Sequence, residues 1–148
     1  PLVGAVEWPS GKTPNEDMVQ QIMSVSEQKI SLKTAETLVD TYGTRSAQVV
    51  GLVLANPDLG TLLLPDSDRS EILAQVYYSV EQELAQSITD VLIRRTQIFF
   101  KDLNQGLDCV ELIADHMEKL LGWTKEQRTF HIQEYQKEVD RSRRWRDG

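Results

Sequence analysis

One cysteine and two histidines are the side chains of this 148-residue chain best suited to nucleophilic or metal chemistry. Cys109 and His116 are seven residues apart, which puts them on one face of a helix, but two helical turns separate them too far for proton transfer. Apolar neighbours indicate that Cys109 is a buried, unreactive thiol. His116 and His131 lie on different expected helices, and no glycine-rich phosphate loop is present. We therefore expect no catalytic residue, no metal site and no cofactor site in this fragment.

Two adjacent arginines, Arg94 and Arg95, lie in a run flanked on both sides by bulky apolar residues. One interpretation is an ion pair between Asp90 and Arg94, four residues apart on an exposed helix face. The other is that at least one guanidinium is buried and bidentate to Glu83 or Asp90, or reaches across an interface to a partner domain. Adjacent helical residues point about 100° apart and so address different surroundings, which favours the second interpretation.

A second basic cluster surrounds Trp145 near the end of the chain. Cations in the last turn of a helix are stabilised by its dipole, and this is the favoured explanation. The alternative is contact of a parent protein with an anionic membrane, for which tryptophan beside basic residues is suited. In both cases we expect the segment to be dispensable for folding. The four arginines are Arg141, Arg143, Arg144 and Arg146.

Composition narrows the classes of partner. The formal net charge of −7 and the pI near 4.8 argue against nucleic acid, whose phosphates require a basic surface. A single cysteine fits a reducing, cytoplasmic compartment. No stretch approaches the roughly 18 apolar residues of a membrane span, and no signal peptide is evident. Because the chain begins at Pro1 without methionine, we expect a piece of a longer protein.

Hydrophobic periodicity predicts an all-α fold: a compact single domain of six to seven helices over residues 15–148, preceded by an extended linker over residues 1–14. Residues 103–121 have the clearest pattern, with one apolar face over about five turns. Leu62, Leu63 and Leu64 are expected to pack inward from a loop. The expected helices span residues 15–29, 32–42, 45–55, 68–84, 87–99, 103–121 and 124 onward.

Capping residues predict where these helices begin and end. Ser31 is expected to begin one helix, and Gly43 and Gly122 are expected to end two others with left-handed backbone. Three further starts pair a capping side chain with a polar residue three positions later. These pairs are Asp68 with Glu71, Ser87 with Asp90, and Thr124 with Gln127.

Several motifs together resemble a known family. The blocks YSVEQE at 78–83 and SITDVLIRRT at 87–96 closely resemble the C-terminal domain of FAD-dependent glycerol-3-phosphate dehydrogenases and the related oxidases. YGTR at 42–45 and LGW at 121–123 are similar to further family motifs, and PLVGA at 1–5 is similar to the link that leaves the flavin domain. Two departures remove positive charge, because Glu81 and Gln97 stand where the family often has arginine. These departures leave Glu83, Asp90, Arg94 and Arg95 intact.

The resemblance implies a parent enzyme that oxidises sn-glycerol 3-phosphate to dihydroxyacetone phosphate. Hydride would pass to FAD and electrons to a membrane quinone or, in the oxidases, to oxygen. The FAD and substrate sites would lie in the upstream flavin domain of the same chain, leaving this fragment inactive alone. Glu83, Asp90, Arg94 and Arg95 would have a structural or domain-interface role, and the cytoplasmic parent would associate peripherally with the inner face of a membrane. The alternative is a free-standing helical module that presents a groove to partner helices.

Overall fold

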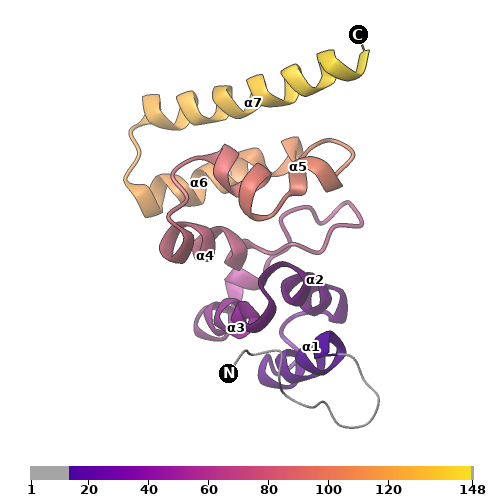
Figure 1. Ribbon diagram of the computed structural model, residues 1–148. Coiled ribbons are helices and arrows are strands. Elements are labelled where there is room, and N and C mark those ends of the chain that lie inside the picture. The colour runs from indigo at the N-terminus through magenta and orange to yellow at the C-terminus, as the bar shows by residue number, and fades with distance from the viewer. Residues whose placement is uncertain (1–13, 148) are drawn as a thin grey trace, which may run out of the picture. The chain divides into compact units, whose positions relative to one another are not determined.

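A computed structural model describes residues 14–147, which form two compact units that meet in sequence between Gly60 and Thr61. The predicted all-α fold is confirmed, because the described residues contain seven α-helices and no strand longer than an isolated bridge (Figure 1). The predicted linker lies outside the described residues except for Pro14, which begins the first helix. No helix within residues 14–147 is both long enough and apolar enough to cross a membrane.

The first unit is built from three α-helices that contact one another pairwise: α1 (Pro14–Val25), α2 (Leu32–Tyr42) and α3 (Ser46–Ala55). Single 3-10 turns follow α2 at Gly43–Arg45 and α3 at Pro57–Gly60. The helix predicted to reach residue 29 ends at Val25, because Glu27 and Gln28 adopt positive φ. The fully buried apolar side chains among the described residues of this unit are Ala35, Leu38, Val49, Val50 and Val53.

The start of α2 follows the predicted capping chemistry, and its end is at the predicted glycine. The backbone N–H of Thr34 donates to Ser31 Oγ at 3.0 Å, which satisfies one of the unpaired amides of the first turn. At the other end Gly43 ends the helix with a φ of 56°, but its ψ of −125° lies outside the predicted left-handed helical region. Glycine adopts this conformation at little cost. The local sequence is therefore sufficient to place this helix.

The second unit contains α4 (Leu73–Glu83), a π-helical turn (Asp90–Arg95), α5 (Ile98–Lys101), α6 (Val110–Leu121) and α7 (Lys125–Asp147). α6 packs between α4 and α7, and Figure 1 shows the long α7 running past α6 and over the α5 region. The core of the second unit is mainly apolar. The fully buried residues include Val76, Ile88, Val91, Leu92, Ile98, Ile113, Met117, Tyr135 and Val139.

α4 does not begin at the predicted cap. Glu71 is buried and receives two hydrogen bonds from Arg69, at 3.1 Å from Nε and 2.6 Å from Nη2. Its carbonyl accepts from the Leu63 N–H in an antiparallel bridge, so this segment is extended rather than helical. The helix begins at Leu73, where the Gln75 side chain accepts from the preceding amide at 2.9 Å. The predicted capping pair of Asp68 with Glu71 is therefore wrong. The Glu71 carbonyl belongs to the bridge, and the Glu71 carboxylate pairs with Arg69.

The regular helix predicted for residues 103–121 is wrong in its first two turns. Leu103 is 99% exposed, and an α-helix begins only at Val110 after a 3-10 turn over Leu107–Cys109. Two consecutive residues with positive φ, Gln105 at 55° and Gly106 at 76°, interrupt the helix. A Cβ atom at Gly106 would lie 3.0 Å from the Ile98 side chain, so this tight turn requires glycine for space as well as for conformation.

The predicted capping pair at the start of α7 is confirmed. Thr124 N–H donates to Gln127 Oε1 at 2.8 Å, and Gln127 N–H donates to Thr124 Oγ1 at 3.1 Å. Arg128, one residue further, contacts three carboxylates of α6 and so joins the two helices. The predicted left-handed glycine at the end of α6 is also present, with a φ of 67° at Gly122.

Candidate functional site

The motif residues Asp90 to Arg95 form a π-helical turn. The backbone N–H and the hydroxyl of Thr96 both donate to the Val91 carbonyl, at 2.9 and 2.8 Å, which closes the five-residue spacing of a π-turn. Single π-turns are rare and occur frequently at functional sites. Gln97 then adopts a φ of 59°, so the predicted helix over residues 87–99 is interrupted before α5.

Asp90 is the residue that organises the start of this turn. The Ser87 hydroxyl accepts from the Asp90 N–H at 3.0 Å, and the Asp90 carboxylate accepts from the Gln86 N–H at 2.9 Å. The predicted cap is therefore confirmed. Partial burial tends to raise the pKa of Asp90, but hydrogen bonds from the Gln86 amide and the Arg94 guanidinium outweigh burial and hold this pKa below its usual range.

Arg95 closes the end of α4. Its Nη2 donates to the Glu83 carbonyl at 3.1 Å, and its Nη1 lies 3.6 Å from Glu83 Oε2. A cation at this position is favoured by the unpaired carbonyls of a helix C-terminus. Leu84, the residue after Glu83, has a φ of 60° and is 75% exposed, so an apolar side chain is exposed at the end of the helix that Arg95 contacts.

The geometry of Arg94 and Arg95 combines parts of both sequence interpretations. The ion pair between Asp90 and Arg94 is formed, as the first interpretation predicts. The expected burial of a guanidinium is wrong, because the side chains of Arg94 and Arg95 are 65% and 40% exposed. The π-turn directs both arginine side chains outward. Asp90 fixes the position of Arg94, and Glu83 fixes the position of Arg95. The expectation that these residues face a partner domain stays a prediction.

The residues first considered for nucleophilic or metal chemistry have structural contacts. Cys109 is fully buried, as predicted, and desolvation raises the pKa of its thiol to about 12. His116 Nδ1 lies 2.8 Å from the Tyr77 hydroxyl and links α6 to α4. The His131 ring stacks on Trp123 with centroids 4.3 Å apart. No group of three or more potential metal-ligating side chains gathers anywhere in residues 14–147.

A polar cluster that sequence reasoning missed is centred on Gln105, which is almost fully buried. The Tyr135 hydroxyl donates to the Gln105 carbonyl. The Gln105 side-chain oxygen accepts from Arg143 Nε at 2.9 Å and from Arg146 Nη2 at 3.2 Å. Arg143 and Arg146 therefore contact the rest of the unit, whereas the expectation that the basic end is dispensable for folding stays a prediction. Nothing in the local sequence could reveal the cluster, because Gln105 is 30 residues from Tyr135 and 38 residues from Arg143 in the chain.

Comparison with known proteins identifies the domain. A profile of the family described as the C-terminal domain of alpha-glycerophosphate oxidase matches residues 1–128, which is most of the chain. The chain belongs to this family. Within the family domain, the match includes the π-turn, Glu83 and Gln105, whereas Tyr135 and the arginines of the basic end lie beyond its last residue.

The relatives of this family domain carry consistent names. A glycerol-3-phosphate dehydrogenase of Synechocystis is 31% identical over 101 residues, covering 68% of this chain and 18% of the relative. A glycerol-3-phosphate dehydrogenase of Mycobacterium leprae is 30% identical, covering 70% and 17%. An aerobic glycerol-3-phosphate dehydrogenase of Staphylococcus epidermidis is 25% identical, covering 76% and 19%. The domain thus spans less than a fifth of these proteins. No solved structure matches it.

Proposed function

We propose that this chain is the non-catalytic helical C-terminal domain of an FAD-dependent glycerol-3-phosphate dehydrogenase. The parent would oxidise sn-glycerol 3-phosphate to dihydroxyacetone phosphate and pass the electrons through FAD to a quinone. Membership of the family, together with relatives named glycerol-3-phosphate dehydrogenase, carries this proposal. The FAD and substrate sites belong to the upstream domain in this proposal, and the isolated fragment is inactive.

The domain's role in this proposal is to pack against the upstream flavin and substrate domain. The surface formed by Leu84, Arg94 and Arg95 is the proposed contact, with Glu83 and Asp90 as its supports. Leu84 combines a left-handed backbone, which carries a conformational cost, with an exposed apolar side chain that a partner at this surface would cover. Each arginine also retains N–H donors that its carboxylate partner does not use, since a guanidinium carries more donors than these contacts require.

The proposed localisation follows from the proposed acceptor. Quinones are dissolved in the membrane, so a cytoplasmic parent that reduces one must reach the inner face of the bilayer. We therefore propose peripheral membrane association of the parent.

The reaction is tested on the full-length protein that carries this domain. The purified protein is expected to reduce a soluble quinone analogue when sn-glycerol 3-phosphate is added, without NAD, and to show flavin absorbance. Hydrogen peroxide produced in place of reduced quinone would assign oxygen as the acceptor. Absence of any reduction dependent on sn-glycerol 3-phosphate in a flavin-loaded protein would refute the proposed reaction.

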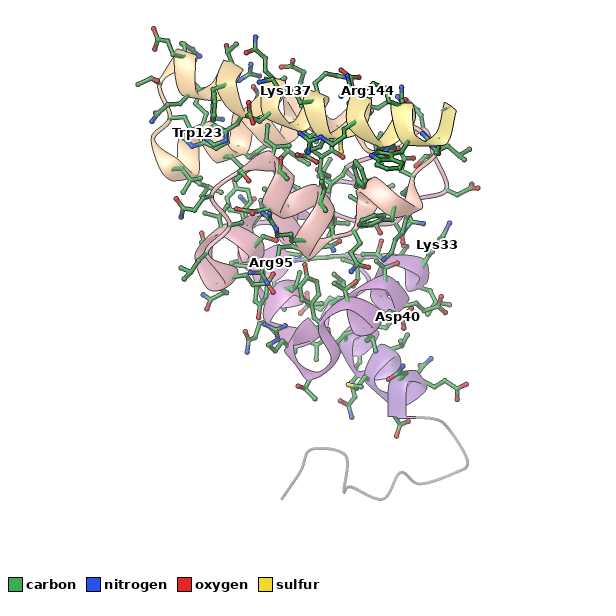
Figure 2. The ribbon with its side chains drawn as sticks, turned by 45° about the horizontal axis from the view of Figure 1, so that its top comes forward. Lys33, Asp40, Arg95, Trp123, Lys137 and Arg144 are labelled. Carbon is green, nitrogen blue, oxygen red and sulfur yellow. The ribbon has the colours of Figure 1, made fainter. Side chains whose placement is uncertain are left out.

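The domain contact is tested separately in the same protein. Leu84→Ser and Arg95→Ala are expected to uncouple the thermal unfolding of the C-terminal domain from that of the upstream domain, giving two transitions in place of one. Lys137→Ala is the matched control, because Figure 2 shows Lys137 on the outer side of α7, where it pairs only locally with Glu134. Unchanged, coupled unfolding in both test variants would show that this surface is not the contact.

A further inference from the structure

Two cations near the end of α7 share one uncharged acceptor. Arg143 Nε and Arg146 Nη2 both donate to Gln105 Oε1, at 2.9 and 3.2 Å. Arg143 Nη2 also donates to Asn104 Oδ1 at 3.0 Å. Because the two guanidinium groups bind the same atom, they lie close together against the turn at residues 104–106.

The charge of this pair is not offset by a direct ion pair within the described part of the chain, although the carboxylates of Asp102 and Asp108 accept hydrogen bonds from the same turn. Gln105 and Asn104 are neutral amides and carry no charge that could offset the arginines. The two guanidinium groups are both positive, and at short distance they repel each other. Among residues 14–147, neither Arg143 nor Arg146 forms an ion pair with a described carboxylate. Arg141, in contrast, pairs with Glu138 at 2.8 Å. The C-terminal dipole of α7 is equivalent to only about half a negative charge. The pair therefore carries positive charge that no direct ion pair offsets.

The two guanidinium groups are also held in place. Gln105 is nearly buried, its carbonyl accepts from the Tyr135 hydroxyl, and its amide nitrogen donates to Ser142 Oγ at 3.3 Å. The contacts with the turn use two N–H groups of Arg143 and one of Arg146, so further donors of both side chains remain available. Donors that are oriented before a ligand arrives lose little entropy when it binds.

We propose that Arg143 and Arg146 form a binding site for a phosphate group. Arginine matches the tetrahedral oxygens of phosphate through paired hydrogen bonds, and two neighbouring guanidinium groups favour a multiply charged anion over chloride. The phosphate group could belong to a free phosphate ester or to a lipid headgroup, and both have this chemistry. A lipid source would also account for Leu103 and Trp145, which adjoin the site in sequence and are 99% and 83% exposed. The proposal does not depend on the reaction of the parent.

Gln105→Glu is the decisive variant. A carboxylate at this position can still accept hydrogen bonds from both arginines, but its negative charge offsets one of their two positive charges. Phosphate affinity is expected to fall about tenfold or more, the consequence of losing one charge-assisted interaction, while the fold is kept. The double variant Arg143→Gln with Arg146→Gln removes both guanidinium groups and their charge, and it is expected to lose the same binding. Arg141→Gln, on the same helix but paired with Glu138, is the matched control.

The measurement uses the full-length protein, whose thermal unfolding is followed in inorganic phosphate and in chloride at equal ionic strength. A ligand that binds the folded state raises the unfolding temperature, and the difference between the unchanged protein and Gln105→Glu isolates this site from any other phosphate site. Binding to vesicles of phosphatidylglycerol or phosphatidylcholine is measured in parallel. A phosphate response lost in both test variants identifies a free phosphate site, whereas loss of phosphatidylglycerol binding alone identifies a lipid headgroup site. Equal responses of all four proteins in both assays would overturn the proposal.

Discussion

Removal of the Tyr135 hydroxyl tests whether the turn at residues 104–106 is held by α7. Tyr135 is fully buried, and its hydroxyl donates to the carbonyl of Gln105, which is itself nearly buried. Tyr135→Phe keeps the aromatic ring and its edge-to-face contact with Phe99, with centroids 6.2 Å apart. The substitution therefore isolates the hydrogen bond from the packing of the ring.

The expected cost is about 1–3 kcal/mol of unfolding free energy, because a buried carbonyl loses its donor and water does not readily replace it. With a urea dependence of about 1–3 kcal/mol per molar, the denaturation midpoint should fall by about 1 M. Tyr77→Phe is the control. Its hydroxyl bonds to His116 at a half-buried position where water can substitute, so its cost should be smaller. A loss for Tyr135→Phe no larger than that for Tyr77→Phe would refute this account of the turn.

Three further outcomes are expected. Met117→Ala should cost about 2–5 kcal/mol in chemical denaturation, because this side chain is fully buried, whereas Leu103→Ala should change stability by less than about 0.5 kcal/mol. Gly106→Ala should cost more than about 1 kcal/mol, through positive φ and the close Ile98 methyl, and an unchanged denaturation midpoint would contradict that strain. Desolvation, aided by Lys119, lowers the pKa of His116, so the unfolded state binds its proton first and stability falls as pH drops below about 6.5. His116→Gln should reduce this fall between pH 7.5 and 5, and an unchanged slope would exclude His116 as a contributor.

The geometry of the π-turn gives the two motif arginines different structural roles. Arg94 pairs along its own turn with Asp90, whereas Arg95 reaches the last carbonyl of α4 and so joins the π-turn to that helix. Loss of Arg95 should therefore loosen the end of α4, an effect that loss of Arg94 should not have. This difference allows the structural contribution of Arg95 to be separated from its proposed contact with an upstream domain.

Short-range capping chemistry could be predicted from the sequence alone. Ser31, the pair Ser87 and Asp90, and the pair Thr124 and Gln127 bond to backbone amides within four residues, so local sequence decides these helix starts. The left-handed glycine at Gly122 is predictable for the same reason. The buried thiol of Cys109 also follows from its apolar neighbours. In each case the determining atoms lie within one or two helical turns of one another.

Long-range contacts decided what the sequence could not. The apolar pattern over residues 103–121 is helical by itself, but Tyr135 and Arg143 bind the turn from a helix about 30 residues away and stabilise its positive φ values. Glu71 has the spacing of a capping residue, yet contacts at shorter range compete for it: its carbonyl accepts from Leu63, eight residues earlier, and its carboxylate binds Arg69, two residues earlier. Groups such as these can bond to local or to distant partners, and only the folded structure determines which partner is close enough to bind.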